Sequence, residues 1–98
     1  MYIYPEILFF TSAHCSPCKP VEKLLKRINM SLFGKKLKIK KIDISNAKYN
    51  DIIRDENVLS VPTIIIGKKK LVSSSIEEIE IVDSILNCFL KSVSLGGK

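Results

Sequence analysis

Two cysteines separated by two residues are the part of this sequence best suited to chemistry. They form the motif Cys15-Ser16-Pro17-Cys18, and the third cysteine, Cys88, lies far along the chain. A pair with this spacing can exchange disulfides, close a structural disulfide or contribute two ligands to a metal site. Which of the three applies depends on the neighbouring residues and on the elements that hold the pair.

The neighbouring residues give little support to a metal site or to a purely structural bridge. His14 is adjacent but cannot readily join both cysteines in one tetrahedron, and the sequence has no second Cys-x-x-Cys motif. A disulfide across so few residues closes too small a loop to stabilise the fold much. Both alternatives stay open, and reversible redox chemistry is the hypothesis we favour. We therefore expect no metal and no bound cofactor, only a redox-active Cys15–Cys18 disulfide served by an external electron donor.

The cysteines lie where a strand should give way to a helix. Ile7-Leu8-Phe9-Phe10 is an apolar run typical of a strand buried on both faces. From Pro17 to Gly34, apolar residues recur at spacings of three and four, which predicts an amphipathic helix. Cys15 would then lie at the helix start, where free backbone N–H groups and the positive end of the helix dipole face its sulfur.

This placement favours a reactive Cys15. Such surroundings lower the pKa of a cysteine thiol from about 8.5 into the range of roughly 3.5 to 7.5, and the thiolate is the form that attacks a disulfide. Cys18 would lie about one turn deeper on the same helix face, where it can attack a mixed disulfide formed at Cys15. Ser16 and the rigid Pro17 would tune the pair. His14 either adds a positive charge beside Cys15 when protonated or is simply solvated.

The middle of the chain predicts three strands and a short helix. Residues 35–44 combine lysines with aliphatic residues, which is typical of a strand at a sheet edge with one exposed face. A short helix should run over residues 46–57, with its apolar side chains facing inward. Residues 63–66 form a β-branched strand, and a tight turn at Gly67-Lys68 leads into a hairpin strand over residues 69–72. The inward residues of the short helix are Tyr49, Ile52 and Ile53.

A last helix follows the hairpin. Ser75-Ile76-Glu77-Glu78 has the form of a capping box that would open it. Cys88, near Ile81 and Ile85, would lie off the apolar stripe of this helix as a small core or boundary residue. Residues 94–98 should be a frayed tail. The expected stripe consists of Ile79, Val82, Leu86, Phe89 and Val93.

This order of elements predicts one α/β domain over residues 1–98. The first two strands enclose a helix, so they should be parallel, and the last two form an antiparallel hairpin. The expected fold is therefore a four-stranded mixed sheet flanked by three helices.

Composition excludes several classes of protein. With 98 residues, 46% of them hydrophobic, the chain is neither disordered nor fibrous. Its net charge of +6 favours acidic partners, but the lysine runs at 35–41 and 68–70 lack the interleaved aromatic residues of a nucleic-acid surface. No apolar run reaches the roughly 18 residues of a membrane span, and residues 1–6 do not resemble a secretory signal. We expect a cytoplasmic protein, a monomer, that binds neither nucleic acid nor membranes.

A second feature is Val61-Pro62-Thr63, at the mouth of the third strand. Proline cannot donate to a sheet ladder, so it belongs at a strand start or in a strained turn. A cis bond between Val61 and Pro62 would be a deliberate local feature. The simpler alternative is a proline that only begins a strand.

Together these features resemble the thioredoxin superfamily. The resemblance rests on the strand that leads to Cys15-Ser16-Pro17-Cys18, on Val61-Pro62-Thr63 and on the hairpin after it, and it covers residues 3–93. The chain length and the single strand before the motif are similar to those of glutaredoxin-sized archaeal members.

The resemblance implies a role for each motif residue. Cys15 would be the exposed nucleophile and Cys18 the buried resolving thiol. Pro62 would be a cis proline beside them, and Val61, with Thr63, would bind an extended substrate chain through the backbone. The implied function is a thiol–disulfide oxidoreductase that acts on disulfides of other proteins and accepts electrons from a thiol reductase.

The sequence also departs from the family pattern. His14 stands where thioredoxins carry a tryptophan, and Ser16-Pro17 replaces Gly-Pro between the cysteines. Phe9 stands where they carry a buried acid, so proton transfer to Cys18 must use water or another group. The glutathione-binding residues of glutaredoxins are replaced by Ser73-Ser74-Ser75. Two alternatives to a protein disulfide reductase stay open: a redox switch or adaptor without turnover, and a glutathione-dependent reductase.

Overall fold

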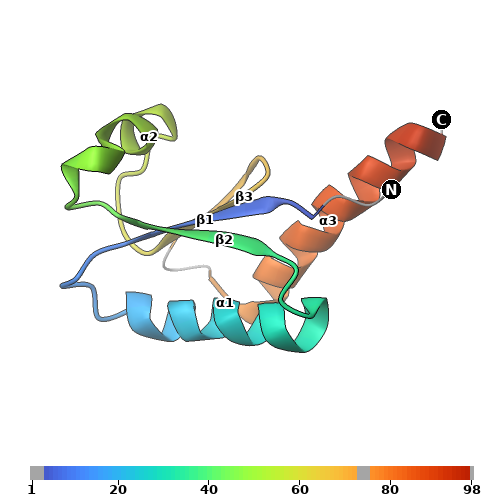
Figure 1. Ribbon diagram of the computed structural model, residues 1–98, viewed down its shortest axis with the longest axis horizontal. Coiled ribbons are helices and arrows are strands. Elements are labelled where there is room, and N and C mark those ends of the chain that lie inside the picture. Colours follow the sequence, from blue (N-terminus) through green and yellow to red (C-terminus); the bar gives the residue numbers. More distant parts are fainter. Residues whose placement is uncertain (1–3, 73–75, 98) are drawn as a thin grey trace.

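The computed structural model describes residues 4–72 and 76–97, with side chains as far as residue 90 (Figure 1). Two strands enclose the first helix, and a hairpin and a long helix complete the chain. The elements are β1 (Glu6–Thr11), α1 (Cys18–Phe33), β2 (Lys38–Asp43), the 3₁₀ turn η1 (Ala47–Tyr49), α2 (Asn50–Asp55), β3 (Thr63–Ile66), β4 (Lys69–Val72) and α3 (Glu78–Gly97).

The sheet confirms the predicted fold class. Its four strands have the order β2-β1-β3-β4. β1 pairs in parallel with β2 and antiparallel with β3, and β3 pairs antiparallel with β4. The parallel pair flanks the crossover helix α1, and β2 lies at one edge, as its lysines predict. The result is an α/β fold with a mixed sheet and helices on both faces.

Each face of the sheet has its own core because successive side chains of a strand point to opposite sides. α1 and α3 cover one face, and α2 covers the other (Figure 1). All residues of β1 after Glu6 are buried, so this central strand contributes to both cores. The core under α1 and α3 includes Ile7, Phe9, Ile64, Ile66 and Leu71. The core under α2 includes Leu8, Phe10, Ile42 and Ile65.

A left-handed turn ends α1 and delays the next strand. Gly34 caps the helix with φ 56°, and Lys35 follows with φ 65°. The Asn29 side-chain amide then holds the chain after the turn by two hydrogen bonds to the Leu37 backbone. It accepts from the Leu37 N–H at 3.0 Å and donates to the Leu37 carbonyl at 3.3 Å. β2 therefore begins at Lys38 rather than at the predicted residue 35.

The predicted stripe of α3 is only partly correct: Val82 packs against the core and the Phe89 ring lies 5.4 Å from the Tyr4 ring, but Ile79 and Leu86 face outward. Ile79 is 65% exposed and Leu86 is 42% exposed, whereas Ile81 and Ile85 are fully buried. The helix carries apolar residues on more than one side, so spacing alone cannot choose the side that meets the sheet. The face that packs is the one with Cys88, whose partly buried side chain joins the core. The side chain of Val93 and the cap residue Ser75 lie outside the described part.

Smaller elements agree with the sequence. Asn46 caps the short helical segment by accepting from the Lys48 N–H at 3.0 Å, and Asn57, with φ 55°, follows its end. Gly67 takes φ 61° in the predicted hairpin turn. α3 is helical to Gly97, and fraying over residues 94–98 stays a prediction about its dynamics. Among the described helices, none is long and apolar enough to span a bilayer.

Candidate active site

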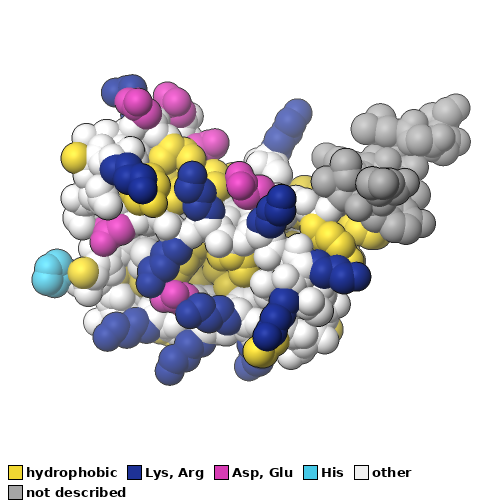
Figure 2. Space-filling model, viewed as in Figure 1, with side chains coloured by type: hydrophobic (Ala, Val, Ile, Leu, Met, Phe, Trp, Pro, Cys, Tyr) yellow, Lys and Arg dark blue, Asp and Glu magenta, His cyan; other side chains and the backbone are white. Residues whose placement is uncertain are grey.

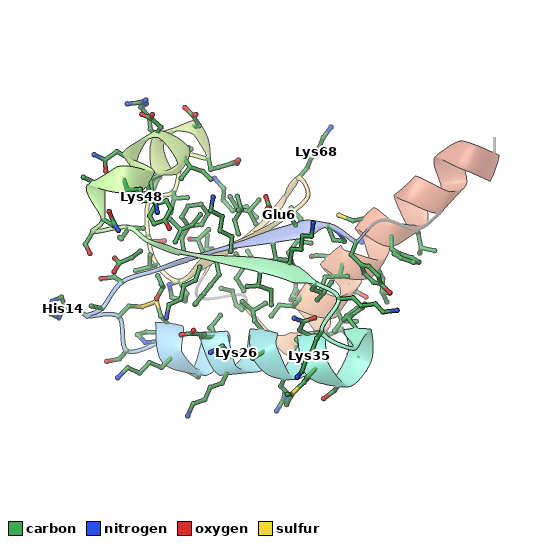
Figure 3. All side chains as sticks on the ribbon, in the orientation of Figure 1. Glu6, His14, Lys26, Lys35, Lys48 and Lys68 are labelled. Atoms are coloured by element: carbon green, nitrogen blue, oxygen red, sulfur yellow. A yellow bond between two sulfur atoms is a disulfide. The ribbon has the colours of Figure 1, made fainter. Side chains whose placement is uncertain are left out.

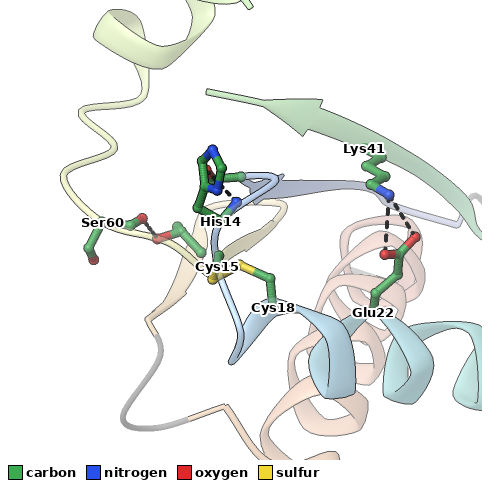
Figure 4. The surroundings of a disulfide bond; sticks show 8 residues. His14, Cys15, Cys18, Glu22, Lys41 and Ser60 are labelled. Carbon is green, nitrogen blue, oxygen red and sulfur yellow. Dashed lines mark hydrogen bonds and ion pairs between the residues drawn. A yellow bond between two sulfur atoms is a disulfide. The ribbon is translucent and has the colours of Figure 1, made fainter. Parts of the chain in front are cut away.

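The two cysteines of the motif form a disulfide at the junction of β1 and α1 (Figure 4). Their Cα atoms are 5.3 Å apart. Cys18 is the first residue of α1 and is 2% exposed, while Cys15 lies in the preceding loop and is partly exposed. Cys15 is therefore the more accessible of the two bonded residues, and Cys18 belongs to the core.

The backbone around Cys15 offers fewer free donors than the sequence predicts. The N–H groups of Cys15, Cys18 and Lys19 donate to the carbonyls of Ser12, Cys15 and Ser16 at 3.1–3.3 Å. Pro17 and Pro20 have no N–H to offer. The support that the helix gives to a Cys15 thiolate therefore comes mainly from its dipole. The first turn, Cys18-Lys19-Pro20-Val21, contains no carboxylate that would oppose it.

The three residues predicted to tune the pair lie at the surface. Ser16 and Pro17 are exposed, and Pro17 is the N-cap residue of α1. His14 is exposed, and its side chain points away from the body of the protein at the tip of the loop (Figure 3). The His14 backbone N–H donates to the Ser12 hydroxyl at 3.4 Å. His14 is thus next to Cys15 in sequence, with its imidazole directed to solvent.

The Val61–Pro62 peptide bond is cis, which confirms the second predicted feature. Val61 is partly exposed and shares with Cys15 a shallow pocket of about 400 Å³. It precedes β3, whose ladder begins at Thr63, so its backbone lies outside the described strand pairs. The other residues around this pocket are Ser12, His14, Ser16, Pro17 and Ile44.

The side chain of Thr63 is buried and has a partner within the protein. Its side chain is 1% exposed, and its hydroxyl donates to the Ser60 carbonyl at 2.7 Å. Pro62 is buried as well. Of the three residues predicted to bind substrate, Val61 is therefore the one with accessible surface. Thr63 fixes the loop that presents it.

A second pocket, of about 250 Å³, lies beside the disulfide and contains a charge pair that sequence reasoning missed. Glu22 of α1 and Lys41 of β2 both line it, and the Lys41 ammonium lies 3.2 Å from the Glu22 carboxylate. Lys26, one turn along α1, approaches the same carboxylate at 3.4 Å. The signal in the sequence was Glu22 four residues after Cys18, a spacing that places both on one helix face.

Both carboxyl groups of this second pocket favour their ionised form. Burial by itself raises the pKa of Glu22, but hydrogen bonds and charges from Lys41 and Lys26 outweigh it and hold that pKa below its ordinary value. Asp43 also has a lowered pKa, mainly because the Ser45 hydroxyl and backbone N–H donate to it. The pocket beside Cys18 is therefore charged at neutral pH.

At the β1 position where the family pattern has a buried acid, this chain has the apolar residue Phe9. Phe9 is 1% exposed, and it is in register with Lys41 on one side and Ile64 on the other. Within the described residues, no group of His, Cys, Asp and Glu side chains gathers in a way that could hold a metal ion.

The fold and the site together define a small α/β protein with a redox-type Cys-x-x-Cys disulfide at a strand–helix junction and a cis-proline loop nearby. The family model for thioredoxin matches residues 4–91. The chain belongs to the thioredoxin family. Membership of this family and the Cys15–Cys18 disulfide together support thiol–disulfide oxidoreductase chemistry. Membership of the archaeal, glutaredoxin-sized subgroup stays a prediction.

Solved structures agree with this fold. Oxidised thioredoxin O2 from Arabidopsis thaliana is 20% identical with a TM-score of 0.68, and the match covers 88% of this chain and 76% of that one. Oxidised mitochondrial thioredoxin 3 from Saccharomyces cerevisiae is 19% identical with a TM-score of 0.67, over 85% and 77% of the two chains. Thioredoxin 1 from Thermosipho africanus is 23% identical with a TM-score of 0.66, over 95% and 99%. No curated protein matches the sequence significantly.

Proposed function

We propose that this protein reduces or exchanges disulfides in other proteins through the Cys15–Cys18 dithiol. The observation that carries the proposal is the unequal burial of the two bonded cysteine residues at the start of α1. Only the partly exposed Cys15 can meet a protein substrate, and only Cys18 is held next to it out of solvent. Membership of the thioredoxin family supports the same chemistry.

In the proposed cycle, the Cys15 thiolate attacks one sulfur of a substrate disulfide. The substrate S–S bond breaks, a mixed disulfide forms at Cys15, and the other substrate sulfur leaves as a thiolate. Cys18 then attacks the Cys15 sulfur, which releases the second substrate thiolate and forms the Cys15–Cys18 disulfide. The substrate gains two electrons and the protein loses two. An external thiol reductase restores the dithiol.

The shallow pocket that joins Cys15 and Val61 is the proposed substrate site. A backbone lying outside a sheet ladder can pair with an extended chain, and Val61 offers such a backbone beside the reactive sulfur. The lining of this pocket includes no Lys or Arg, but Lys and Arg side chains spread over the face that carries α1 and β2 (Figure 2). We propose acidic protein substrates, a monomeric protein and a reducing compartment such as the cytoplasm.

Reduction of insulin disulfides, with dithiothreitol as electron donor, tests the proposal. The protein should accelerate insulin reduction well above the rate with dithiothreitol alone, and Cys15→Ser should abolish the acceleration. Cys88→Ser is the matched control, because it removes a thiol outside the site and should retain activity. Equal rates with and without the protein would contradict turnover and favour the redox-switch alternative.

A further inference from the structure

The loop that leads from α2 to the cis proline presents Val61 beside Cys15. Of its residues, Leu59 is 87% exposed, and Ser60 is exposed as well. Val58 and Val61 are partly buried and pack against the core under α2. Packing therefore holds two positions of this loop, and the order of the rest depends on polar contacts.

The loop begins at a helix end whose last carbonyls need donors. α2 is short, and the chain leaves it through Asn57, which has φ 55°. The Asn57 N–H donates to the Arg54 carbonyl and the Val58 N–H donates to the Ile53 carbonyl, both at 3.0 Å. These two bonds close the helix in the usual left-handed way. The carbonyls of Glu56 and Asn57 come after this turn, so they have no partner within the helix.

Lys70 of the edge strand β4 supplies the missing donors. Its ammonium lies 2.7 Å from the Glu56 carbonyl oxygen and 3.2 Å from the Asn57 carbonyl oxygen. No other protein group in the described part of the chain donates to either carbonyl. Lys70 is in register with Ile65, which belongs to the core under α2, so both side chains lie on that face of the sheet. Lys70 therefore ties the end of α2 to the sheet.

The other end of the loop is held by Thr63, the first residue of β3. Its hydroxyl donates to the Ser60 carbonyl at 2.7 Å (Figure 4). Val61 thus lies between two fixed points, four residues after Asn57 and one after Ser60. Lys70 and Thr63 belong to neighbouring strands, so the sheet sets the position of the loop at both ends.

We propose that Lys70 is a positioning residue for the substrate site: by anchoring the carbonyls of Glu56 and Asn57, it holds the Val61 backbone where an extended substrate chain can pair with it. This inference rests on the proposed function, in which that backbone binds the chain around the substrate disulfide. Lys70 lies outside the pocket that Cys15 and Val61 share, so it acts through the loop. A loop already held in place loses less conformational entropy when a chain binds.

Lys70→Met tests this role, because it removes the donors and keeps an unbranched side chain. In the insulin assay the KM should rise about threefold to tenfold with kcat little changed, as expected for the loss of a charge-assisted hydrogen bond at an exposed site. Hydroxyethyl disulfide, which is small and neutral and has no peptide groups, provides the comparison. It should oxidise the pre-reduced protein, freed of dithiothreitol, at the parent rate within about twofold.

These measurements are made in a Cys88→Ser background, so that only the Cys15–Cys18 dithiol is oxidised. Each turnover with hydroxyethyl disulfide forms one protein disulfide and two molecules of mercaptoethanol, and the loss of protein thiols follows it. Two variants serve as controls. Lys69→Met removes the same charge from the adjacent position of β4, whose side chain lies on the opposite face and lines the pocket beside Cys88. Lys70→Arg keeps both charge and donors, so it should restore most of the insulin KM.

The Val58 amide reports the anchoring without any substrate. Its N–H donates to the Ile53 carbonyl, so it is protected from hydrogen exchange while the end of α2 stays closed. Lys70→Met should accelerate exchange of this amide by about threefold to tenfold. Lys69→Met and Lys70→Arg should change it little. Hydrogen exchange followed by NMR measures the effect.

A higher KM for insulin, absent with hydroxyethyl disulfide and in Lys69→Met, supports the proposal when exchange at Val58 is also faster. Equal losses with both disulfides would overturn it, because Lys70 would then act on the dithiol or on the whole fold. Equal effects of Lys69→Met, or unchanged exchange at Val58, would overturn it as well. A parent protein inactive towards insulin would refute the proposed function, and exchange at Val58 would still decide whether Lys70 anchors the loop.

Discussion

Two regions of this molecule pair a cysteine with a charged pocket, and only one of them forms a redox-type disulfide. The pocket beside Cys18 has about 250 Å³ and contains Glu22 and Lys41. The pocket beside Cys88 has about 270 Å³ and contains both lysines and carboxylates. Cys88, however, lies within α3 and forms no disulfide. Its sulfur lies 3.8 Å from the Ile66 carbonyl oxygen.

The difference shows what a redox site requires beyond a thiol and nearby charges. Cys18 has a second sulfur within bonding distance, which Cys88 does not have among the described residues. Its partner Cys15 precedes a helix N-terminus, where the dipole favours a thiolate. Cys88 instead fills space against the hairpin turn at Gly67. Its position makes it a packing residue.

The largest expected effect separates the three cysteines by their ability to trap partners. Cys18→Ser should accumulate mixed disulfides on Cys15, because the resolving attack is lost. Cys15→Ser should trap few or none, since the remaining Cys18 is buried. Cys88→Ser should behave as the unmodified protein. Non-reducing electrophoresis with and without a reductant reads the result, and equal trapping by Cys15→Ser and Cys18→Ser would refute the assigned roles.

A change of stability should mark the Cys88 region. Gly67→Ala places a side chain at φ 61°, and its Cβ would lie 2.5 Å from the Cys88 sulfur. The backbone conformation and the close contact together should destabilise the fold by about 2 to 4 kcal/mol. Urea unfolding measures the effect.

A second substitution sharpens this test. Adding Cys88→Ala removes the sulfur that the new Cβ meets, so Gly67→Ala should cost less in that background, about 1 to 2 kcal/mol for the left-handed backbone alone. An undiminished cost would mean that Cys88 does not pack as the structure places it. Insulin reduction should be retained in every variant that folds.

The smallest effect concerns the pH dependence of stability at the Cys18 pocket. Because the lysines hold the Glu22 pKa below its ordinary value of 4.5, the unfolded chain binds this proton more readily than the folded protein. The Glu22–Lys41 pair therefore stabilises the folded protein at pH values above the ordinary pKa of 4.5. This stabilisation is lost as the pH falls through the lower pKa that Glu22 has in the folded protein. The contribution should stay below about 1 kcal/mol, as for other ion pairs near the surface.

Thermal unfolding at neutral pH and in acid measures this contribution. The loss of stability on acidification should be slightly smaller in Glu22→Gln than in the unmodified protein. Lys41→Gln should reduce it in the same way, because it removes the main partner of the carboxylate. An acid sensitivity unchanged in both variants would show that the pair adds no net stability.

Much of the fold was predictable because local patterns and connectivity agree. The apolar run of β1 and the helical spacing of α1 fix a parallel crossover, and Gly67 marks the hairpin turn. The face of α3 was not predictable from spacing. Ile79 and Leu86 form a stripe as regular as that of Ile81 and Ile85, and only packing against β3 and β4 distinguishes them.

The site, too, was predictable from the sequence only in part. The Cys15–Cys18 disulfide and the cis bond before Pro62 follow from motifs. The Glu22–Lys41 pair joins residues 19 positions apart on different elements, so it depends on how β2 returns beside α1. The engaged N–H groups near Cys15 depend on turns that close before the helix begins.

The unequal burial of the two bonded cysteine residues also bears on chemical damage. A small electrophile arriving from solvent would meet Cys15 first, and a single adduct there would stop the whole exchange cycle while leaving the core intact. The same asymmetry is useful for labelling: in a Cys88→Ser background, one alkylating group per molecule would report the fraction of molecules in which the Cys15–Cys18 disulfide is reduced.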